Sequence, residues 1–203
     1  MKMKRQSQLE IFENTKNPNH KLQLLLDNDA LSKSTNSGVI SDLFKYANSI
    51  GSKLILESMT KIEYLRDLYN PKGELIREAI VEKFEEAVIQ REVMKKIVDN
   101  SILISKILKR CNNKNSTDFV DLFLIGRVML QHTTLGIISG NKSDFPDTIF
   151  DCVSIIRISN GINSHVFYEM NFNSDKFNEE YEALKVEQEK QKEAMEEDLA
   201  KIV

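Results

Sequence analysis

The longest apolar stretch of this chain, Asp118 to Ser139 (DFVDLFLIGRVMLQHTTLGIIS), is the sequence feature that most constrains the fold. Its apolar residues point in several directions when drawn on a helix, instead of forming one stripe. A helix that is apolar on most of its circumference is usually surrounded by other helices. Because Asp121 and Arg127 interrupt the stretch, it does not qualify as a membrane span. The stretch therefore predicts the central helix of a globular domain.

The composition favours an all-α fold. The chain has 203 residues, of which 29% are charged and 41% hydrophobic, as in ordinary globular proteins. Its 7 Gly and 3 Pro leave little room for the turn-rich pattern of a small β-sandwich or barrel. The length is sufficient for one sizeable domain with a core, and no second domain is required.

Apolar residues at steps of three and four predict two long helices, from about Val39 to Tyr69 and from Glu74 to about residue 110. Asn70-Pro71-Lys72-Gly73 separates them, so they should form a long antiparallel helix hairpin. A short amphipathic segment, 20–33, precedes the hairpin. This hairpin and the central helix predict a helical bundle.

The later part of the chain is expected to add two further helices. The segment 147–159 predicts a helix, although its β-branched residues Val153 to Ile156 also fit a short strand. Residues 160–173 are expected to be irregular. A charge-rich helix begins at Ser174, and its first half should pack on the bundle while its second half projects or contacts a second copy. The expected organisation is a flexible arm (1–19), a helical core domain (20–173) and a C-terminal charged helix (174–203).

Charge and cysteine content exclude several functional classes. The net charge of −3 and the pI near 5.7 argue against a broad basic surface, so strong direct nucleic-acid binding is not expected. The basic residues near the start are followed by polar residues rather than an apolar signal region, which predicts a cytoplasmic protein. Cys111 and Cys152 are far apart and belong to no ligand cluster, so no metal or cofactor is expected. Frequent Lys, Asn and Ile suggest a bacterial or mobile-element origin such as a phage or plasmid.

The N-terminal arm contains the pentapeptide QLEIF, which runs from Gln8 to Phe12. It resembles the short motif QL(S/D)LF by which bacterial DNA polymerases, repair factors and replication regulators dock on the β sliding clamp. The resemblance implies that Leu9, Ile11 and Phe12 fill apolar subsites while Gln8 satisfies polar groups at the rim. The alternative is a short amphipathic turn packed on the protein's own core.

Arg127 and His132 form the one candidate catalytic pair in the sequence. Their RxxxxH spacing resembles the HEPN family of helical ribonucleases and toxins, in which the histidine acts in acid-base chemistry and the arginine binds phosphate at a cleft between two subunits. The alternative is structural, with Arg127 paired to a carboxylate such as Asp121. Di-iron, phosphate-loop, nucleophile-elbow and zinc patterns are absent from the sequence.

These features predict a non-enzymatic helical interaction protein that acts in DNA replication by docking on the sliding clamp through Gln8, Leu9, Ile11 and Phe12. Two alternatives remain. One is a HEPN-type ribonuclease that uses Arg127 and His132, and the other is a homo-oligomeric structural protein. No motif in the sequence indicates a partner for the helical body.

Overall fold

The structure is a computed structural model that describes residues 8–13, 18–35, 38–66, 70–87, 89–111, 117–160 and 163–202. In this part of the chain, the strands form one mixed sheet in the order β1-β6-β7-β5-β2-β3-β4. The strands β5, β2, β3 and β4 are parallel, whereas β7 pairs antiparallel with β5, and β6 and β1 continue the antiparallel half. The strands are β1 (Gln8–Glu13), β2 (Gln23–Leu26), β3 (Lys53–Leu56), β4 (Glu85–Glu86), β5 (Leu135–Ser139), β6 (Phe150–Asn160) and β7 (Asn163–Phe172).

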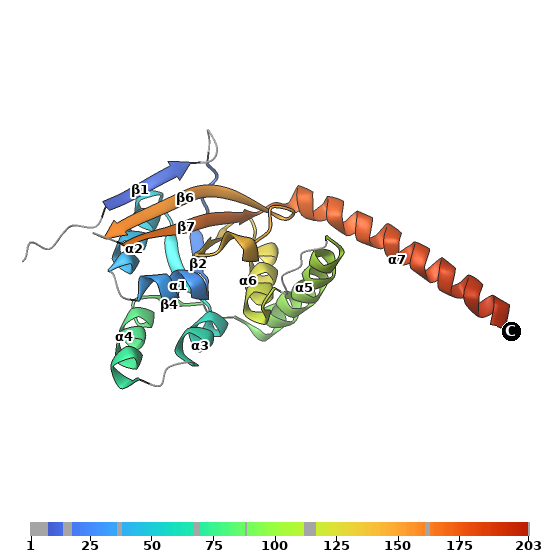
Figure 1. Ribbon diagram of the computed structural model, residues 1–203, viewed down its shortest axis with the longest axis horizontal. Coiled ribbons are helices and arrows are strands. Elements are labelled where there is room, and N and C mark those ends of the chain that lie inside the picture. The colour runs from blue at the N-terminus through green and yellow to red at the C-terminus, as the bar shows by residue number, and fades with distance from the viewer. Residues whose placement is uncertain are drawn as a thin grey trace, which may run out of the picture.

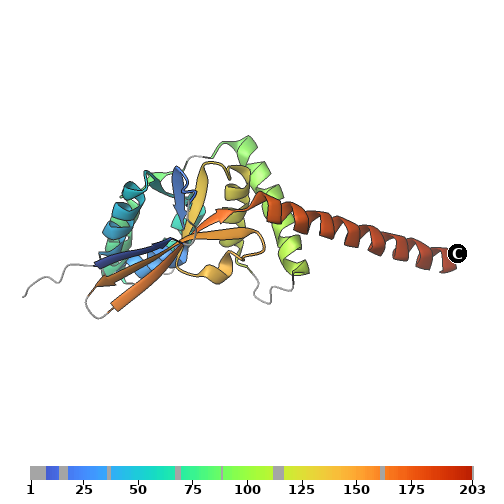
Figure 2. The same ribbon diagram turned by 90° about the horizontal axis from the view of Figure 1, so that it is seen from above.

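Helices cover both faces of the sheet (Figures 1 and 2). Along β2, Leu24 and Leu26 contribute to an apolar cluster with α1 and α2, while Leu25 points the other way and joins a cluster with α5, α6 and α7. This alternation is the strand period of two, and both faces are buried, as is usual for parallel strands. The helices are α1 (Asn28–Ser34), α2 (Val39–Ser49), α3 (Ser58–Arg66), α4 (Pro71–Val81), α5 (Arg91–Arg110), α6 (Phe119–Leu130) and α7 (Ser174–Ile202).

The all-α helical bundle expected from the sequence is therefore wrong, and the fold is mixed α/β with a large mixed sheet. In β2 and β3 one exposed polar residue is followed by three buried apolar residues, and all five residues of β5 are buried. Such short runs do not show a strand alternation, and they fit inside a helical pattern when they adjoin true helices.

The predicted helix hairpin of residues 39–110 is also wrong. Gly51 takes a positive φ of 73° directly after α2, a conformation that glycine adopts without a steric cost. The chain then enters β3 instead of continuing the helix. In the second half, β4 separates α4 from α5. The helical periodicity was real over α2, α3, α4 and α5, but these are separate crossover helices.

The apolar stretch 118–139 contains a helix and a strand rather than one central helix. Asp118 caps α6 by accepting a hydrogen bond from the backbone amide of Val120 at 3.0 Å. The helix ends near Leu130, and β5 follows a turn. The helix predicted for 147–159 is wrong, because most of this segment lies in the strand β6 (Phe150–Asn160), which includes Val153 to Ile156. The region expected to be irregular, 160–173, contains the strand β7.

At the N-terminal end the structure has a strand where a flexible arm was expected, whereas at the C-terminal end it has the expected helix. Residues 8–13 of the expected flexible arm form the edge strand β1. The helix predicted from Ser174 is α7, whose beginning packs against the body through Phe177 and Leu184 and through an ion pair between Arg110 and Glu180. Beyond this region α7 projects away from the body (Figures 1 and 2). Contact with a second copy stays a prediction. In the described part of the chain, no helix combines the length and apolarity needed to cross a bilayer.

Candidate functional site

The order of the parallel strands defines where a ligand is expected. The chain moves from β2 to β3 on one side, whereas β5 lies on the other side of β2. The topological switch point therefore falls between β2 and β5. In open α/β sheets, ligands bind outside the carboxyl ends of the strands at this point. Here Asp27 follows β2 directly, and a loop with Asn141 and Asp144 follows β5.

Asp27 is the innermost group at this edge, with an exposed fraction of 1%. One carboxyl oxygen, Oδ1, accepts hydrogen bonds from the backbone amides of Ala30 at 2.6 Å and Gly140 at 3.4 Å. Gly140 is needed for this approach, because a Cβ at this position would lie 2.9 Å from the backbone carbon of Asp29. Burial raises the pKa of Asp27 to about 7.

Further carboxyl groups surround Asp121 in the first turns of α6. Burial, followed by the neighbouring negative charges of Asp144, Asp27, Glu63 and Asp118 in that order, raises the pKa of Asp121 to about 8. Burial, followed by repulsion from Asp118 and Asp29, also raises the pKa of Glu63. These side chains come from α1, α3, α6 and the two loops after β2 and β5, so tertiary folding alone brings them together.

The carboxyl groups of this site differ in how exposed they are to solvent. Asp27 is buried, Glu63, Asp121 and Asp144 are partly buried, and Asp29 and Asp118 are exposed at the rim. Asn141 holds Asp144 in place, because its Nδ2 donates to both carboxyl oxygens at 3.1 and 3.0 Å. The carboxyl groups thus range from the buried Asp27 to exposed groups at the rim.

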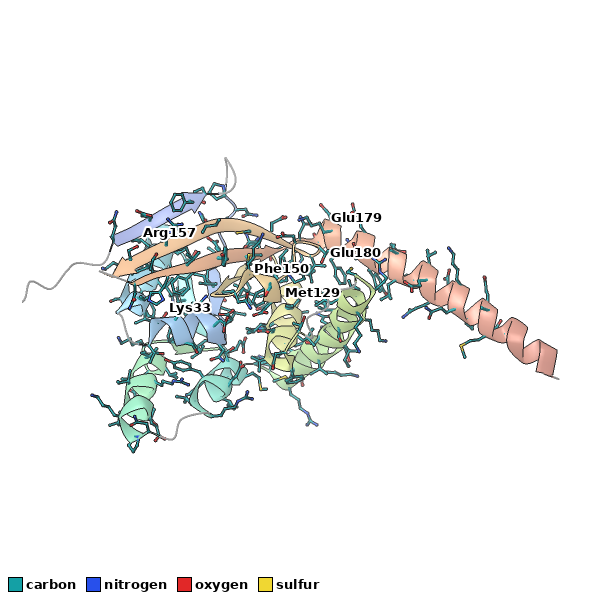
Figure 3. The ribbon with its side chains drawn as sticks, viewed as in Figure 1. Lys33, Met129, Phe150, Arg157, Glu179 and Glu180 are labelled. Atoms are coloured by element: carbon teal, nitrogen blue, oxygen red, sulfur yellow. The ribbon has the colours of Figure 1, made fainter. Side chains whose placement is uncertain are left out.

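Few basic groups neutralise these carboxyls. Arg66, at the end of α3, lowers the pKa of Glu63, but less than burial and Asp118 raise it. Lys33 of α1, labelled in Figure 3, donates from its ammonium to the carbonyl oxygen of Gly140. In the described residues, no three His, Cys, Asp or Glu side chains lie close enough together to hold a metal ion between them. The carboxyls are thus within electrostatic range of one another without converging on one point.

Arg127, the first residue of the expected catalytic pair, is buried and forms a structural ion pair. Its Nε donates to Oε1 of Glu57 at 3.0 Å, and the two residues have exposed fractions of 8% and 0%. Burial raises the pKa of Glu57, whereas Arg127 lowers it. The sequence suggested a carboxylate such as Asp121 as the structural partner of Arg127, and in the structure this partner is Glu57.

His132 lies in the turn between α6 and β5, with Nδ1 3.3 Å from the carbonyl oxygen of Met129. Its ring is 6.1 Å from that of Phe172 and forms part of the wall of a cavity that Arg127 does not line. The structure therefore does not bring Arg127 and His132 into one site within the chain.

The QLEIF residues occupy β1, the outermost strand. Leu9 packs against the core, and Gln8 donates to Glu10 at 3.2 Å. Ile11 and Phe12 are 39% and 48% exposed. On the paired strand β6, Arg157 lies 3.9 Å from Glu10 and 5.6 Å above the ring of Phe12 (Figure 3).

Sequence reasoning missed the carboxyl site because it placed the relevant segments in helices. The available signal was an acidic residue directly after an apolar run, in Leu24-Leu25-Leu26-Asp27, and an Asn-Lys-Ser-Asp loop after the run that ends at Ser139. Once these runs are strands, both loops lie at the carboxyl edge of a parallel sheet.

No protein-family model matches the chain, and neither does any curated protein. The fold and the acidic edge therefore define the class by themselves, as a mixed α/β protein with a carboxylate-rich switch point.

Proposed function

We propose that this protein is a divalent-cation-dependent hydrolase of phosphodiester bonds in nucleic acid, with its active site at the carboxyl ends of β2 and β5. The observation that carries the proposal is Asp121, whose carboxyl group lies within electrostatic range of Asp144, Asp27 and Glu63 from other elements and of Asp118 at the start of its own helix. Packing like charges together opposes folding, and perturbed carboxyls of this kind are concentrated at functional sites. A bound cation would relieve the repulsion.

The carboxyl groups suit Mg²⁺ or Mn²⁺, which prefer oxygen ligands. Mg²⁺ usually keeps several waters and is bound by one or two carboxylates together with substrate phosphates, so a dedicated cage of three protein ligands is not required. Asp27 and Asp121 are the innermost groups at this edge and the best candidates for direct ligands. Asp144 is oriented by Asn141 and would complete the site from the loop after β5.

The residues around the cation would select the reaction. The cation would supply Lewis-acid polarisation of a phosphoryl oxygen and activation of water. The carboxyl groups of Asp29 and Asp118 are exposed at the rim, where an extended strand can approach them. Lys33 and Arg66 come from the same elements as the carboxyls and can contact substrate phosphates. This proposal replaces the expectation of a non-enzymatic protein. It keeps a nuclease activity but assigns it to the carboxyl groups instead of Arg127 and His132.

The test is cleavage of labelled single-stranded RNA and DNA oligonucleotides with Mg²⁺ or Mn²⁺, and with a chelator. We expect cleavage that needs the cation and that falls by about a hundredfold or more in Asp144→Asn, as for loss of a metal-orienting group. Asp147→Asn is the matched control, because Asp147 is an exposed carboxylate of the next turn that pairs with Lys142. Absence of cleavage with either cation would refute the proposal, as would cleavage that persists in the chelator.

A second candidate function is docking on a bacterial sliding clamp through β1, for which the exposure of Ile11 and Phe12 is the supporting observation. These two apolar side chains lie on the outermost strand, where a partner can reach them. Because they are consecutive in a strand, they point to opposite faces of the sheet, so each would fill an apolar subsite of its own while Gln8 contacts the rim. Clamp docking would deliver the hydrolase to replicating DNA, so the two functions are compatible.

Clamp docking is best tested with Ile11→Ala/Phe12→Ala, because neither side chain is in the core. We expect the affinity for purified clamp to fall by about a hundredfold, as for loss of central anchors, with the melting temperature little changed. Leu22→Ala, which removes a leucine that is 65% exposed elsewhere, should bind as the wild type does. Equal binding by the double variant and the wild type in surface plasmon resonance would exclude the motif.

A further inference from the structure

A second site lies at the other edge of the sheet, where the parallel strands begin. A cavity of about 690 Å³ opens there between the segments that precede β2 and β5 and the segment that joins β7 to α7. Its size is within the range of small-molecule sites. It is separate from the carboxyl site, because Asp27 and Asp144 follow the opposite ends of the same strands.

Lys21 is the most unusual residue in the wall of this cavity. Its exposed fraction is 8%, and in the described part of the chain its ammonium has neither a hydrogen bond nor an ion pair. Burial lowers the pKa of Lys21, which the charge of Glu169 partly opposes. Glu169 is itself hydrogen-bonded to His20 at 2.8 Å and to the hydroxyl of Tyr46, so it does not satisfy the ammonium. A ligand in the cavity can therefore supply the partner that the ammonium lacks.

Asn171 provides a second unsatisfied group beside Lys21. Its exposed fraction is 6%, and its Nδ2 donates to the carbonyl oxygen of Asn19 at 2.6 Å. Its Oδ1 is buried without a hydrogen-bond partner. A Cβ at Gly136 of β5 would lie 2.7 Å from this oxygen and 3.2 Å from Cγ of Lys21. Gly136 therefore gives both side chains the space to lie together over the strand.

The remaining polar groups of the wall are already engaged or face the opening. Asp151 is paired with Lys176 at 2.8 Å and accepts a hydrogen bond from Asn173 at 2.8 Å, which hold its pKa below the usual value although burial opposes them. Asn173 also caps the first turn of α7, so these backbone amides are not free for a ligand. The uncompensated cation of the wall is thus Lys21, and the ring of His132 lies nearby.

We propose that this cavity binds a small phosphate monoester with a hydroxyl group near its phosphate, the chemistry shared by mononucleotides and sugar phosphates. The phosphate would accept hydrogen bonds from the ammonium of Lys21, and a hydroxyl would donate to Oδ1 of Asn171. Such a ligand satisfies both orphaned groups at once, whereas a bare anion satisfies one. The rings of His132 and Phe172 both line the cavity at an interplanar angle of 55°, so a nucleobase can stack on either ring.

The experiment measures binding of AMP, ribose 5-phosphate and inorganic phosphate by calorimetry and by backbone amide shifts of Thr133 and Asn171. A chelator is present throughout, so the carboxyl site cannot contribute and the result does not depend on the proposed hydrolase. We expect one or both esters to bind about tenfold or more tightly than inorganic phosphate. Tighter binding of AMP identifies a nucleotide site, and equal binding of both esters identifies a sugar-phosphate site.

Two variants remove the interaction in different ways. Lys21→Met keeps the apolar stem and removes the charge, while Thr133→Glu adds an anion at an exposed position of the rim. Both should weaken ester binding about tenfold or more, because each removes or opposes a charge-assisted hydrogen bond. Lys185→Met, on the exposed face of α7, should bind as the wild type does. Failure of both esters to bind, binding of inorganic phosphate as tight as theirs, or unchanged binding by either cavity variant would overturn the proposal.

Discussion

Replacing Asp121 by asparagine should abolish cation-dependent cleavage and stabilise the cation-free protein at neutral to alkaline pH. The two effects have one cause. The carboxyl group of Asp121 lies among those of Asp144, Asp27, Glu63 and Asp118, which disfavour its ionised form. An asparagine has a similar shape but no charge, so it removes both the repulsion and the negative charge that would attract a cation, and it leaves one carbonyl oxygen in place of two carboxylate oxygens. Activity should fall by about a hundredfold or more.

The stability effect depends on pH with a definite sign. In the folded protein the pKa of Asp121 is raised from 3.8 to about 8, so the folded state holds a proton that the unfolded state releases. The free energy of unfolding should therefore be highest below about pH 4 and fall as the pH rises toward 8. Asp27, with a pKa raised to about 7, adds to the same trend. At pH 8 we expect Asp121→Asn to be more stable than the wild type by about 1–3 kcal/mol.

The measurement is urea unfolding at pH 5 and pH 8, with and without Mn²⁺. Mn²⁺ should stabilise the wild type at pH 8, by about 2.7 kcal/mol when its concentration is a hundredfold above the dissociation constant, and should have little effect on Asp121→Asn. Asp99→Asn is the control, because Asp99 is an exposed carboxylate on α5. If Mn²⁺ stabilises the wild type and Asp121→Asn equally, Asp121 is not part of a cation site.

The elements that could be predicted from the sequence are those whose pattern is long and local. Ser174 and the stripe of Phe177 and Leu184 identified α7, and helical periodicity identified parts of α2 and α5. The short strands were missed because Leu24 to Leu26 and Leu54 to Leu56 are buried on both faces and lie close to helices. A local pattern does not separate such a strand from one turn of a buried helix.

The candidate site was less accessible to sequence reasoning than the fold. Asp27 and Asp144 are more than a hundred residues apart, and only the pairing of β2 with β5 places them at one edge. The placement of Lys21 and Asn171 beside Gly136 likewise depends on the sheet. By contrast, Arg127 and His132 are close in sequence and attracted attention for that reason, although the structure directs them to different surroundings. Charged residues that act together across a sheet leave no motif of fixed spacing.

Arg127→Ala is expected to destabilise the protein strongly. It removes the partner of Glu57, whose exposed fraction is 0% and whose Oε2 already lacks a hydrogen bond. Removing one member of a buried ion pair typically costs about 3–5 kcal/mol. That loss is a large part of the total stability of an ordinary domain. Chemical denaturation, followed by circular dichroism at pH 7, measures it directly.

The matched control is the double variant Glu57→Gln/Arg127→Met, in which neither charge remains. We expect it to recover most of the stability that Arg127→Ala loses, because the cost comes from the unpaired carboxylate rather than from the missing attraction. Without Arg127, the pKa of Glu57 should rise further, so the deficit should shrink as the pH is lowered and the carboxyl takes up a proton. A catalytic arginine would behave differently, since its loss would impair activity while leaving the unfolding midpoint unchanged. An Arg127→Ala protein as stable as the wild type would therefore contradict the structural role and restore the Arg127 and His132 pair as a candidate for catalysis.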